Sequence, residues 1–180
     1  VGNICNASPA GDTIGAAMLY GGVLKVFGPN GYREEPLTNF FKGPGKTVLK
    51  KGELISAVTL PPRGKHGGDA YLRFIPRTEM DIAVVGCAVN LTLDGDRIAT
   101  ARVVLGAVAP TVILVPDAAK AIIGTTLDDG ALNRLAAAAS AACRPISDKR
   151  GTVEFRTEVA GVLAKRAAKI AHDRAKGAGK

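Results

Sequence analysis

Alternating apolar and polar positions mark two segments in the middle of the chain, residues 83–93 and 98–108. The first segment divides into Val85, Cys87, Val89, Leu91 and Leu93 on one face and Ala88, Asn90 and Thr92 on the other. The second divides into Ala99, Ala101, Val103 and Leu105 against Ile98, Thr100, Arg102 and Val104. A period of two predicts strands. Asp94-Gly95-Asp96 indicates a turn between them, and therefore an antiparallel hairpin with one face covered.

The sequence after this hairpin predicts three helices, at 117–123, 128–143 and 152–176. The first follows Pro116 and ends at Gly124. The second is rich in alanine, opens with two carboxylates that suit a helix N-terminus, and stops at Arg144-Pro145. The third carries an apolar stripe of Val159, Val162, Leu163 and Ile170. The C-terminal part is therefore expected to be α+β, a small antiparallel sheet with three helices packed on one side.

The first sixty residues predict a smaller set of strands. An apolar run over 18–27 is followed by the turn sequence GPNG and a polar return, which is typical of a hairpin. A short strand at 54–60 is closed by Pro61 and Pro62. Residues 61–69 show no hydrophobic period. We therefore place a domain boundary there, with one domain at 1–62, a linker at 63–68 and a second domain at 69–180.

Composition narrows the possible classes of function. The 180 residues are 47% hydrophobic but only 4% aromatic, with no tryptophan, so surfaces that stack bases are poorly supplied. The net charge is +8, but the excess concentrates in 165–180, where it suits the solvated face of the last helix. A nucleic-acid interface is disfavoured. Its signature would be binding of DNA or RNA that weakens as the salt concentration rises.

The three cysteines, Cys5, Cys87 and Cys143, lie far apart, and no CxxC pair is present. They are interpreted as buried free thiols, which suit a reducing compartment. No stretch reaches the roughly 18 to 20 apolar residues that span a bilayer, and no signal-peptide pattern is found. We expect a cytoplasmic protein with no membrane span.

Tests for catalytic chemistry give no candidate. His66 and His172 have no companions at ligand spacing, so no metal site is predicted. No base accompanies the serine and cysteine side chains, which disfavours acyl transfer and leaves no catalytic residue. The GPGK sequence at 43–46 lacks the glycine spacing of a phosphate loop and is interpreted as a turn.

The opening stretch GNICNASPAGDT has neither a helical nor a strand period and is predicted to be a loop. Small residues let backbone N–H groups approach a ligand closely, and asparagine and aspartate pair with hydroxyls. Such a loop suits a phosphate, ribityl or ribose ligand. On composition alone an ordinary surface loop is equally compatible.

Five segments, in order along the chain, resemble the FAD-carrying medium subunit of molybdenum-containing hydroxylases, which include xanthine dehydrogenases, aldehyde oxidoreductases and aerobic carbon monoxide dehydrogenases. The first is GNICNASPAGD, similar to that family's second flavin motif, T-I-G-G-N-I-x-N-A-S-P-x-x-D. The others are GELISAVTLP, YLRFIPRTEMDIAVVGCAV, VLGAVAPT and ISDKRGTVEFR. The resemblance implies the end of an FAD-binding domain followed by the family's C-terminal α+β domain, a sheet and three helices.

The resemblance also assigns residues to the cofactor. Gly2 and Asn3 would approach the FAD pyrophosphate and ribityl region, and Asp12 would accept hydrogen bonds from flavin-side hydroxyls. Ile55 takes an apolar position near the isoalloxazine, and Arg73 takes a basic position, commonly lysine, beside the flavin. From the residues alone, Asp12 equally suits a turn cap, Arg73 a strand-surface charge and Ile55 simple core.

The motif's threonine and one glycine have no counterpart before Gly2, and the family's N-terminal FAD subdomain is not in this sequence. The chain therefore holds half of an FAD site, and the other half is expected on a separate chain or a missing segment. The leading hypothesis is an electron-transfer flavoprotein subunit. It would associate with an iron–sulfur small subunit carrying [2Fe-2S] clusters and a large subunit carrying the molybdenum cofactor, as a dimer of heterotrimers. The alternative is a flavin-free docking module of the same kind of complex. The loop 74–82 is expected to influence the choice of electron acceptor.

Overall fold

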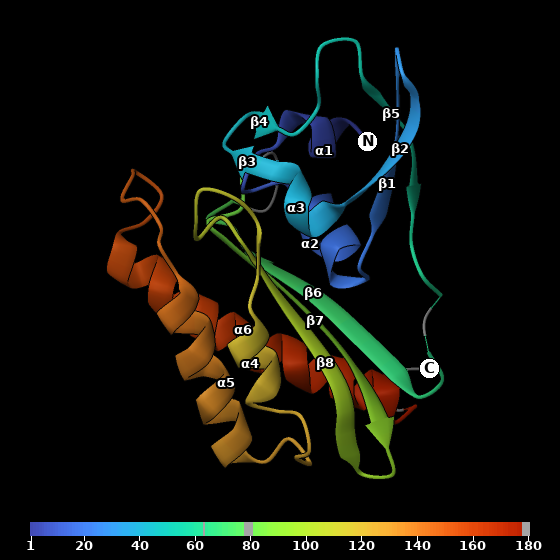
Figure 1. Cartoon of the computed structure of the whole chain (residues 1–180). Helices are drawn as coiled ribbons and strands as arrows, with labels where there is room; N and C mark the ends of the chain where they lie inside the picture. Colours follow the sequence, from blue (N-terminus) through green and yellow to red (C-terminus); the bar gives the residue numbers. More distant parts are fainter. Residues whose placement is uncertain (63, 78–80, 178–180) are drawn as a thin grey trace.

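The computed structural model describes residues 1–62, 64–77 and 81–177. These residues form a four-stranded, a three-stranded and a two-stranded sheet, with helices on both faces of the larger, four-stranded one (Figure 1). The larger sheet is antiparallel in the order β6-β7-β8-β9, formed by Gly67–Phe74, Val85–Asp94, Arg97–Gly106 and Ile113–Leu114. Three helices follow it, α4 (Pro116–Lys120), α5 (Asp129–Ala142) and α6 (Val153–Ala175). The predicted α+β class is confirmed.

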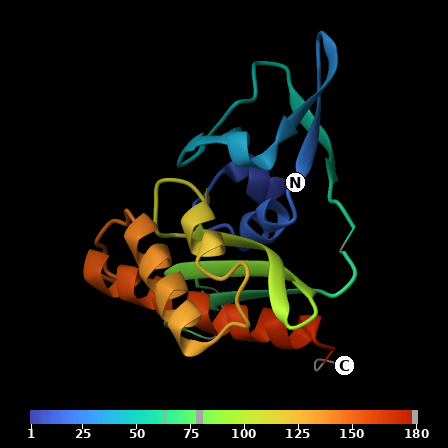
Figure 2. The same ribbon diagram turned by 60° about the horizontal axis from the view of Figure 1, so that its bottom comes forward.

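The main core lies between this sheet and the three C-terminal helices. Figure 2 shows α6 running along one face of the sheet with α5 beside it. The face predicted for β7 is confirmed, since Val85, Cys87, Val89 and Leu91 are fully buried in this core. On the other face, Ala88 belongs to a second core. The period of two in the sequence therefore identified the face of β7 that packs on the C-terminal helices. The expectation of one covered face is wrong, because the opposite face packs in the second core.

The face assignment of β8 is only partly correct. Val103 and Leu105 enter the main core and Val104 enters the second core, as the alternation predicts. Ile98, however, lies in the main core with Val103, and Ala99 is exposed. The pairing of β7 with β8 shifts register between Thr92 and Leu93. One extra residue at such a bulge reverses the faces of the positions beyond it.

The helix boundaries follow local capping. Asp128 caps α5 by accepting a hydrogen bond from the Ala131 amide at 2.7 Å, and Thr152 caps α6 by accepting one from Phe155 at 3.2 Å. The predicted helices at 128–143 and 152–176 are confirmed within a residue or two at each end. The α4 helix starts with Pro116 in its first turn and is shorter than predicted. The basic residues Arg166, Lys169 and Lys176 are exposed, as predicted for the solvated face of the last helix.

The N-terminal part contains a second sheet in the order β2-β1-β5, formed by β1 (Val23–Gly28), β2 (Gly31–Pro36) and β5 (Leu54–Thr59). The predicted hairpin at GPNG is confirmed. A one-turn helix, α3 (Leu37–Phe40), leads into a two-stranded ribbon of β3 (Phe41–Gly43) and β4 (Lys46–Thr47). The turn of this ribbon is the GPGK sequence, and the interpretation as a turn is confirmed.

The opening stretch is not a loop, and that prediction is wrong. It forms two helices, α1 (Gly2–Asn6) and α2 (Asp12–Leu19), joined by a short connection. Ala7 ends α1 in the left-handed conformation with a φ of 49°, a common way to terminate a helix. Asp12 lies in the first turn of α2, where a carboxylate complements the helix dipole. With only five and eight residues, these helices are too short to show a clear period in the sequence.

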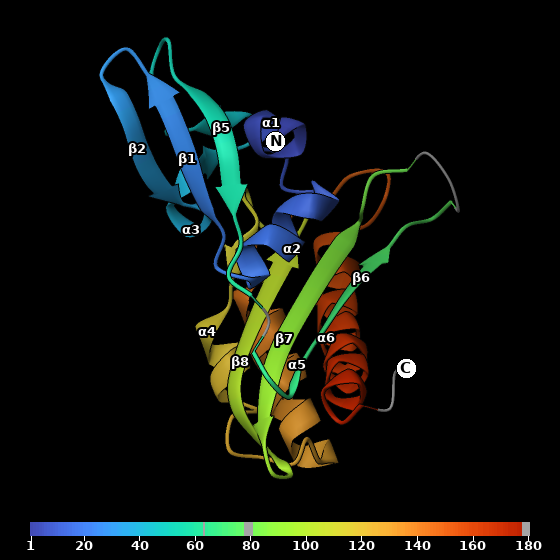
Figure 3. The same ribbon diagram turned by 90° about the vertical axis from the view of Figure 1, so that its right-hand side faces the viewer.

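The α2 helix covers the face of the large sheet opposite to α6. Ile14 and Met18 of α2 join Ala88 and Val104 of the sheet in the second core, which continues into the small sheet. Figure 3 shows α2 between the two sheets. The connection before α2 is tied to the end of β8 by a 2.7 Å hydrogen bond from the Ala107 amide to the Pro9 carbonyl. The opening stretch is therefore fixed against the C-terminal sheet.

Candidate functional site

The Asp12 carboxylate, at the start of α2, is held by two side chains of β6. The Tyr71 hydroxyl donates to Oδ1 at 2.8 Å, and Arg73 Nη1 donates to Oδ2 at 2.5 Å in an ion pair. Tyr71 and Arg73 are two residues apart on one strand, so their side chains project from the same face of the sheet. The structure therefore brings the two predicted charged residues, Asp12 and Arg73, into direct contact. About a third of each side chain remains exposed.

Asn3 lies on the neighbouring helix α1 and connects it to α2. Its side-chain Nδ2 donates to the Thr13 hydroxyl at 3.1 Å, next to Asp12 in the sequence. Gly2 precedes Asn3, and both are exposed. A side chain at Gly2 would meet no atom within 4 Å, so the backbone there is open to solvent. Four of the five predicted residues therefore lie on α1, the start of α2 and the adjoining strand β6.

Ile55 is placed differently from the other four. It lies on β5 opposite Val26 of β1 and is buried in the second core, with 8% of its surface exposed. Its surroundings are those of an ordinary core residue, which sequence reasoning had left open. Only a small part of the side chain is available to any ligand. Its predicted contact with an isoalloxazine ring stays a prediction.

Tyr71 was not identified from the sequence. Its ring lies over two glycines: a Cβ on Gly86 would stand 2.8 Å from the hydroxyl, and one on Gly15 would stand 3.5 Å from the ring. Burial raises the pKa of the Tyr71 hydroxyl, and the hydrogen bond to Asp12 raises this pKa further. The group is therefore a protonated donor at neutral pH. The spacing of Tyr71 and Arg73 was the available signal, but β6 itself was not predicted as a strand.

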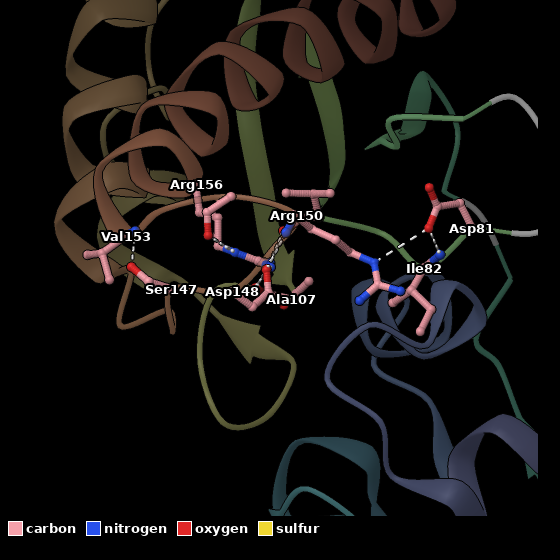
Figure 4. Close-up of polar contacts among 10 residues, drawn as sticks. Asp81, Ile82, Ala107, Ser147, Asp148, Arg150, Val153 and Arg156 are labelled. Atoms are coloured by element: carbon pink, nitrogen blue, oxygen red, sulfur yellow. Dashed lines mark hydrogen bonds and ion pairs between the residues drawn. The ribbon is translucent and has the colours of Figure 1, made fainter.

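A cavity of about 380 Å³, which was also not predicted, is lined in part by the Ser8–Ala10 connection between α1 and α2. Its walls are mostly apolar and come from the α1–α2 connection, the β3–β4 turn and the ends of β7 and β8. They include Pro9, Pro44, Ile82, Ala109 and Ile146. The loop 144–151 closes one side with Arg144, Asp148 and Arg150. Figure 4 shows Arg150 reaching toward Asp81, with 3.5 Å between Nε and Oδ1.

Residues 1–63 match the model of the FAD binding domain in molybdopterin dehydrogenase, and residues 70–171 match that of the CO dehydrogenase flavoprotein C-terminal domain. The chain belongs to the FAD-binding medium subunits of molybdenum hydroxylases. It carries the end of this family's FAD domain and the C-terminal domain. The contact between Asp12 and Arg73 joins the two matched regions.

Relatives support the same assignment. The chain is 35% identical over 175 residues to the carbon monoxide dehydrogenase medium chain of Afipia carboxidovorans, covering 97% of this chain and 60% of that one. It is 31% identical over 166 residues to the xanthine dehydrogenase FAD-binding subunit of Escherichia coli O157:H7, covering 92% of this chain and 57% of that one. The reconstituted CO dehydrogenase from Oligotropha carboxidovorans superposes with a TM-score of 0.92 at 34% identity, covering 96% of this chain and 60% of that chain. The chain therefore spans about 60% of the length of these family members.

Among the described residues, no three histidine, cysteine, aspartate or glutamate side chains gather in a way that could hold a metal ion. Within the residues that the structure describes, no helix is both long and apolar enough to cross a membrane. The cysteines are free: Cys87 and Cys143 are buried as predicted, but Cys5 on α1 is exposed. Residues 78–80, within the 74–82 loop expected to influence the acceptor, lie outside the described residues.

Proposed function

We propose that this chain forms one wall of the FAD site in the flavoprotein subunit of a molybdenum-containing hydroxylase. The observation that carries the proposal is the Asp12–Arg73 contact, because it sets an exposed carboxylate and an exposed guanidinium side by side. They lie where the part that matches an FAD binding domain meets the part that matches a flavoprotein C-terminal domain. Gly2 supplies open backbone on the neighbouring helix α1, and the exposed Asn3 ties this helix to Thr13, next to Asp12.

The side chains fit such a ligand chemically. A carboxylate has about four lone-pair positions, and Tyr71 and Arg73 use two of those on Asp12. The remaining positions suit the hydroxyls of a ribityl chain or a ribose. The open backbone at Gly2 permits close approach of a phosphate-bearing chain. Ile55 contributes to the buried second core rather than to a broad exposed surface.

When bound, FAD supplies the electron-carrying chemistry that no side chain of this chain provides. Arg73 supplies a positive charge, which favours the negative charge of a reduced flavin ring. Asp12 fixes hydroxyl groups and also holds Arg73 in place. No residue of this chain touches the oxidised substrate in the proposed arrangement.

The wider assembly follows from the same proposal. The opposite wall of the FAD site comes from an N-terminal FAD subdomain, as a preceding segment or a separate chain. Electrons arrive from [2Fe-2S] clusters on a small subunit, after substrate oxidation at a molybdenum cofactor on a large subunit, and leave for an external acceptor. The proposed complex is a dimer of such heterotrimers.

Titration of the complete protein with FAD after removal of bound cofactor tests the proposal. We expect Asp12→Ala to raise the Kd for FAD by about tenfold or more, because it removes a charged hydrogen-bonding partner. Asp117→Ala is the matched control, since Asp117 on α4 is exposed and forms a 3.2 Å ion pair with the neighbouring, equally exposed Lys120. A complete protein that retains no FAD would favour the flavin-free docking module instead.

A further inference from the structure

The two oxygens of Asp12 are held by different donors. Tyr71 holds Oδ1 and Arg73 holds Oδ2, and both donors come from the same face of β6. A guanidinium and a carboxylate left to themselves tend to form a bidentate pair with two parallel hydrogen bonds. The Tyr71 hydroxyl takes one of the two lone-pair positions on Oδ1, while the Arg73 contact is at Oδ2. The two donors together therefore fix the orientation of the carboxylate.

The position of the Tyr71 hydroxyl is itself fixed by packing. The ring lies between Gly15 of α2 and Gly86 of β7, and any side chain at Gly86 would stand 2.8 Å from the hydroxyl oxygen. The ring also packs against the second core. An aromatic side chain enclosed in this way has little rotational freedom. The hydroxyl is consequently directed at Asp12 before any ligand arrives.

From these contacts we propose that Tyr71 is a positioning residue of the flavin site. It keeps the Asp12 carboxylate turned so that its unused lone pairs face the ligand. This inference rests on the proposed function, because it assumes that Asp12 contacts FAD. Tyr71 itself acts only through Asp12.

The chain offers a matched control for the loss of a tyrosine hydroxyl. Tyr20, at the end of α2, donates to the Asp69 carboxylate in a second tyrosine–aspartate hydrogen bond between α2 and β6. This pair joins the same two elements as Asp12 and Tyr71. Tyr20→Phe therefore removes a comparable contact without touching Asp12.

The test compares the Kd for FAD of the complete protein with that of Tyr71→Phe and Tyr20→Phe, by flavin fluorescence. We expect Tyr71→Phe to raise the Kd by about tenfold and Tyr20→Phe to leave it within about twofold. In an Asp12→Ala background, Tyr71→Phe should add no further weakening, because both changes act through one carboxylate. An additive effect in that background would overturn the proposal and assign Tyr71 a general structural role.

A second variant reaches the same hydroxyl without altering Tyr71. Gly86→Ala places a methyl group against the hydroxyl and should displace it from Asp12, with a similar rise in the Kd for FAD. Weaker binding in Asp12→Ala but unchanged binding in both Tyr71→Phe and Gly86→Ala would overturn this inference and leave the proposed function standing. Unchanged binding in Asp12→Ala would overturn both.

Discussion

Arg156, in the first turn of α6, forms a 2.8 Å ion pair with Asp148 on the loop that precedes the helix. The same guanidinium donates to the Val84 carbonyl at 2.6 Å. It also donates to the Ala107 carbonyl at 3.3 Å (Figure 4). Only 4% of Arg156 is exposed. One buried cation therefore joins the start of α6 to the start of β7, the end of β8 and the loop that closes the cavity.

Replacing Arg156 should strongly destabilise the protein. Arg156→Met removes the donor to the Val84, Ala107 and Gly151 carbonyls and breaks the ion pair with Asp148, which we expect to cost about 3 kcal/mol of unfolding free energy. Urea denaturation followed by circular dichroism measures this loss. Arg166→Met, on the exposed face of the same helix, is the control and should change stability by less than about 0.5 kcal/mol. Equal effects of the two changes would contradict the structural role given to Arg156.

Stability should depend on pH through Glu53. Paired hydrogen bonds from Arg33 at 2.9 Å lower the pKa of Glu53 from 4.5 to about 2, and the Lys50 amide lowers this pKa as well. Because the folded-state pKa is depressed, the stabilisation is complete above about pH 4.5 and is lost as the pH falls toward 2. The difference in Tm between the wild type and Glu53→Gln should therefore shrink over this range. Glu34→Gln, at an exposed position of β2, is the control and should change the Tm by little.

Gly68 allows β6 to lie directly against α6. A Cβ at this position would stand 1.9 Å from the Ala171 carbonyl oxygen and 2.6 Å from the Ala175 amide nitrogen, both backbone atoms. Since backbone cannot move aside as a flexible side chain does, Gly68→Ala should cost about 3 kcal/mol or prevent folding. Gly64→Ala is the control, because its nearest neighbour would be a methyl group of Thr92 at 3.7 Å. Thermal unfolding distinguishes the two, and a stable Gly68→Ala variant would show that the two backbones are not this close.

The three cysteines should differ sharply in reactivity. Burial raises the pKa of Cys87 to about 12 and that of Cys143 to about 11, while Cys5 is exposed on α1. Because the thiolate is the reactive form, one thiol per chain should react quickly with a disulfide reagent at pH 8. All three should react in denaturant. Cys5→Ser should abolish the fast phase, and a second fast-reacting thiol in the native protein would contradict the burial of this pair.

The strong periodic segments could be predicted from the sequence, and the exceptions have local causes. The faces of β7 follow the alternation, but Ile98 changes face because a bulge at Thr92 and Leu93 adds a residue that the alternation does not register. The opening helices were missed because they are short. Strand β6 was missed because it opens with Gly67 and Gly68, which were assigned to the linker, although Ala70, Leu72 and Phe74 alternate with Asp69, Tyr71 and Arg73.

The candidate site was only partly accessible to sequence reasoning. Resemblance placed Asp12 and Arg73 near one ligand, and their direct contact is a result of the fold, since 61 residues separate them. The role of Tyr71 depends on space left by Gly15 and Gly86, and such space between separate elements is not encoded in any local pattern. The surroundings of Ile55 could not be predicted either, because an apolar residue in a motif looks the same in the sequence whether it faces a ligand or the core.

The large sheet carries a core on each of its faces, with α6 on one side and α2 on the other. Limited proteolysis in the exposed segment Gly64–His66 would divide the chain into an N-terminal and a C-terminal fragment. The two fragments should stay associated after cleavage, because their separation would expose Ile14 and Val104 to water. A nicked molecule should therefore migrate as one particle in gel filtration and as two bands only after denaturation.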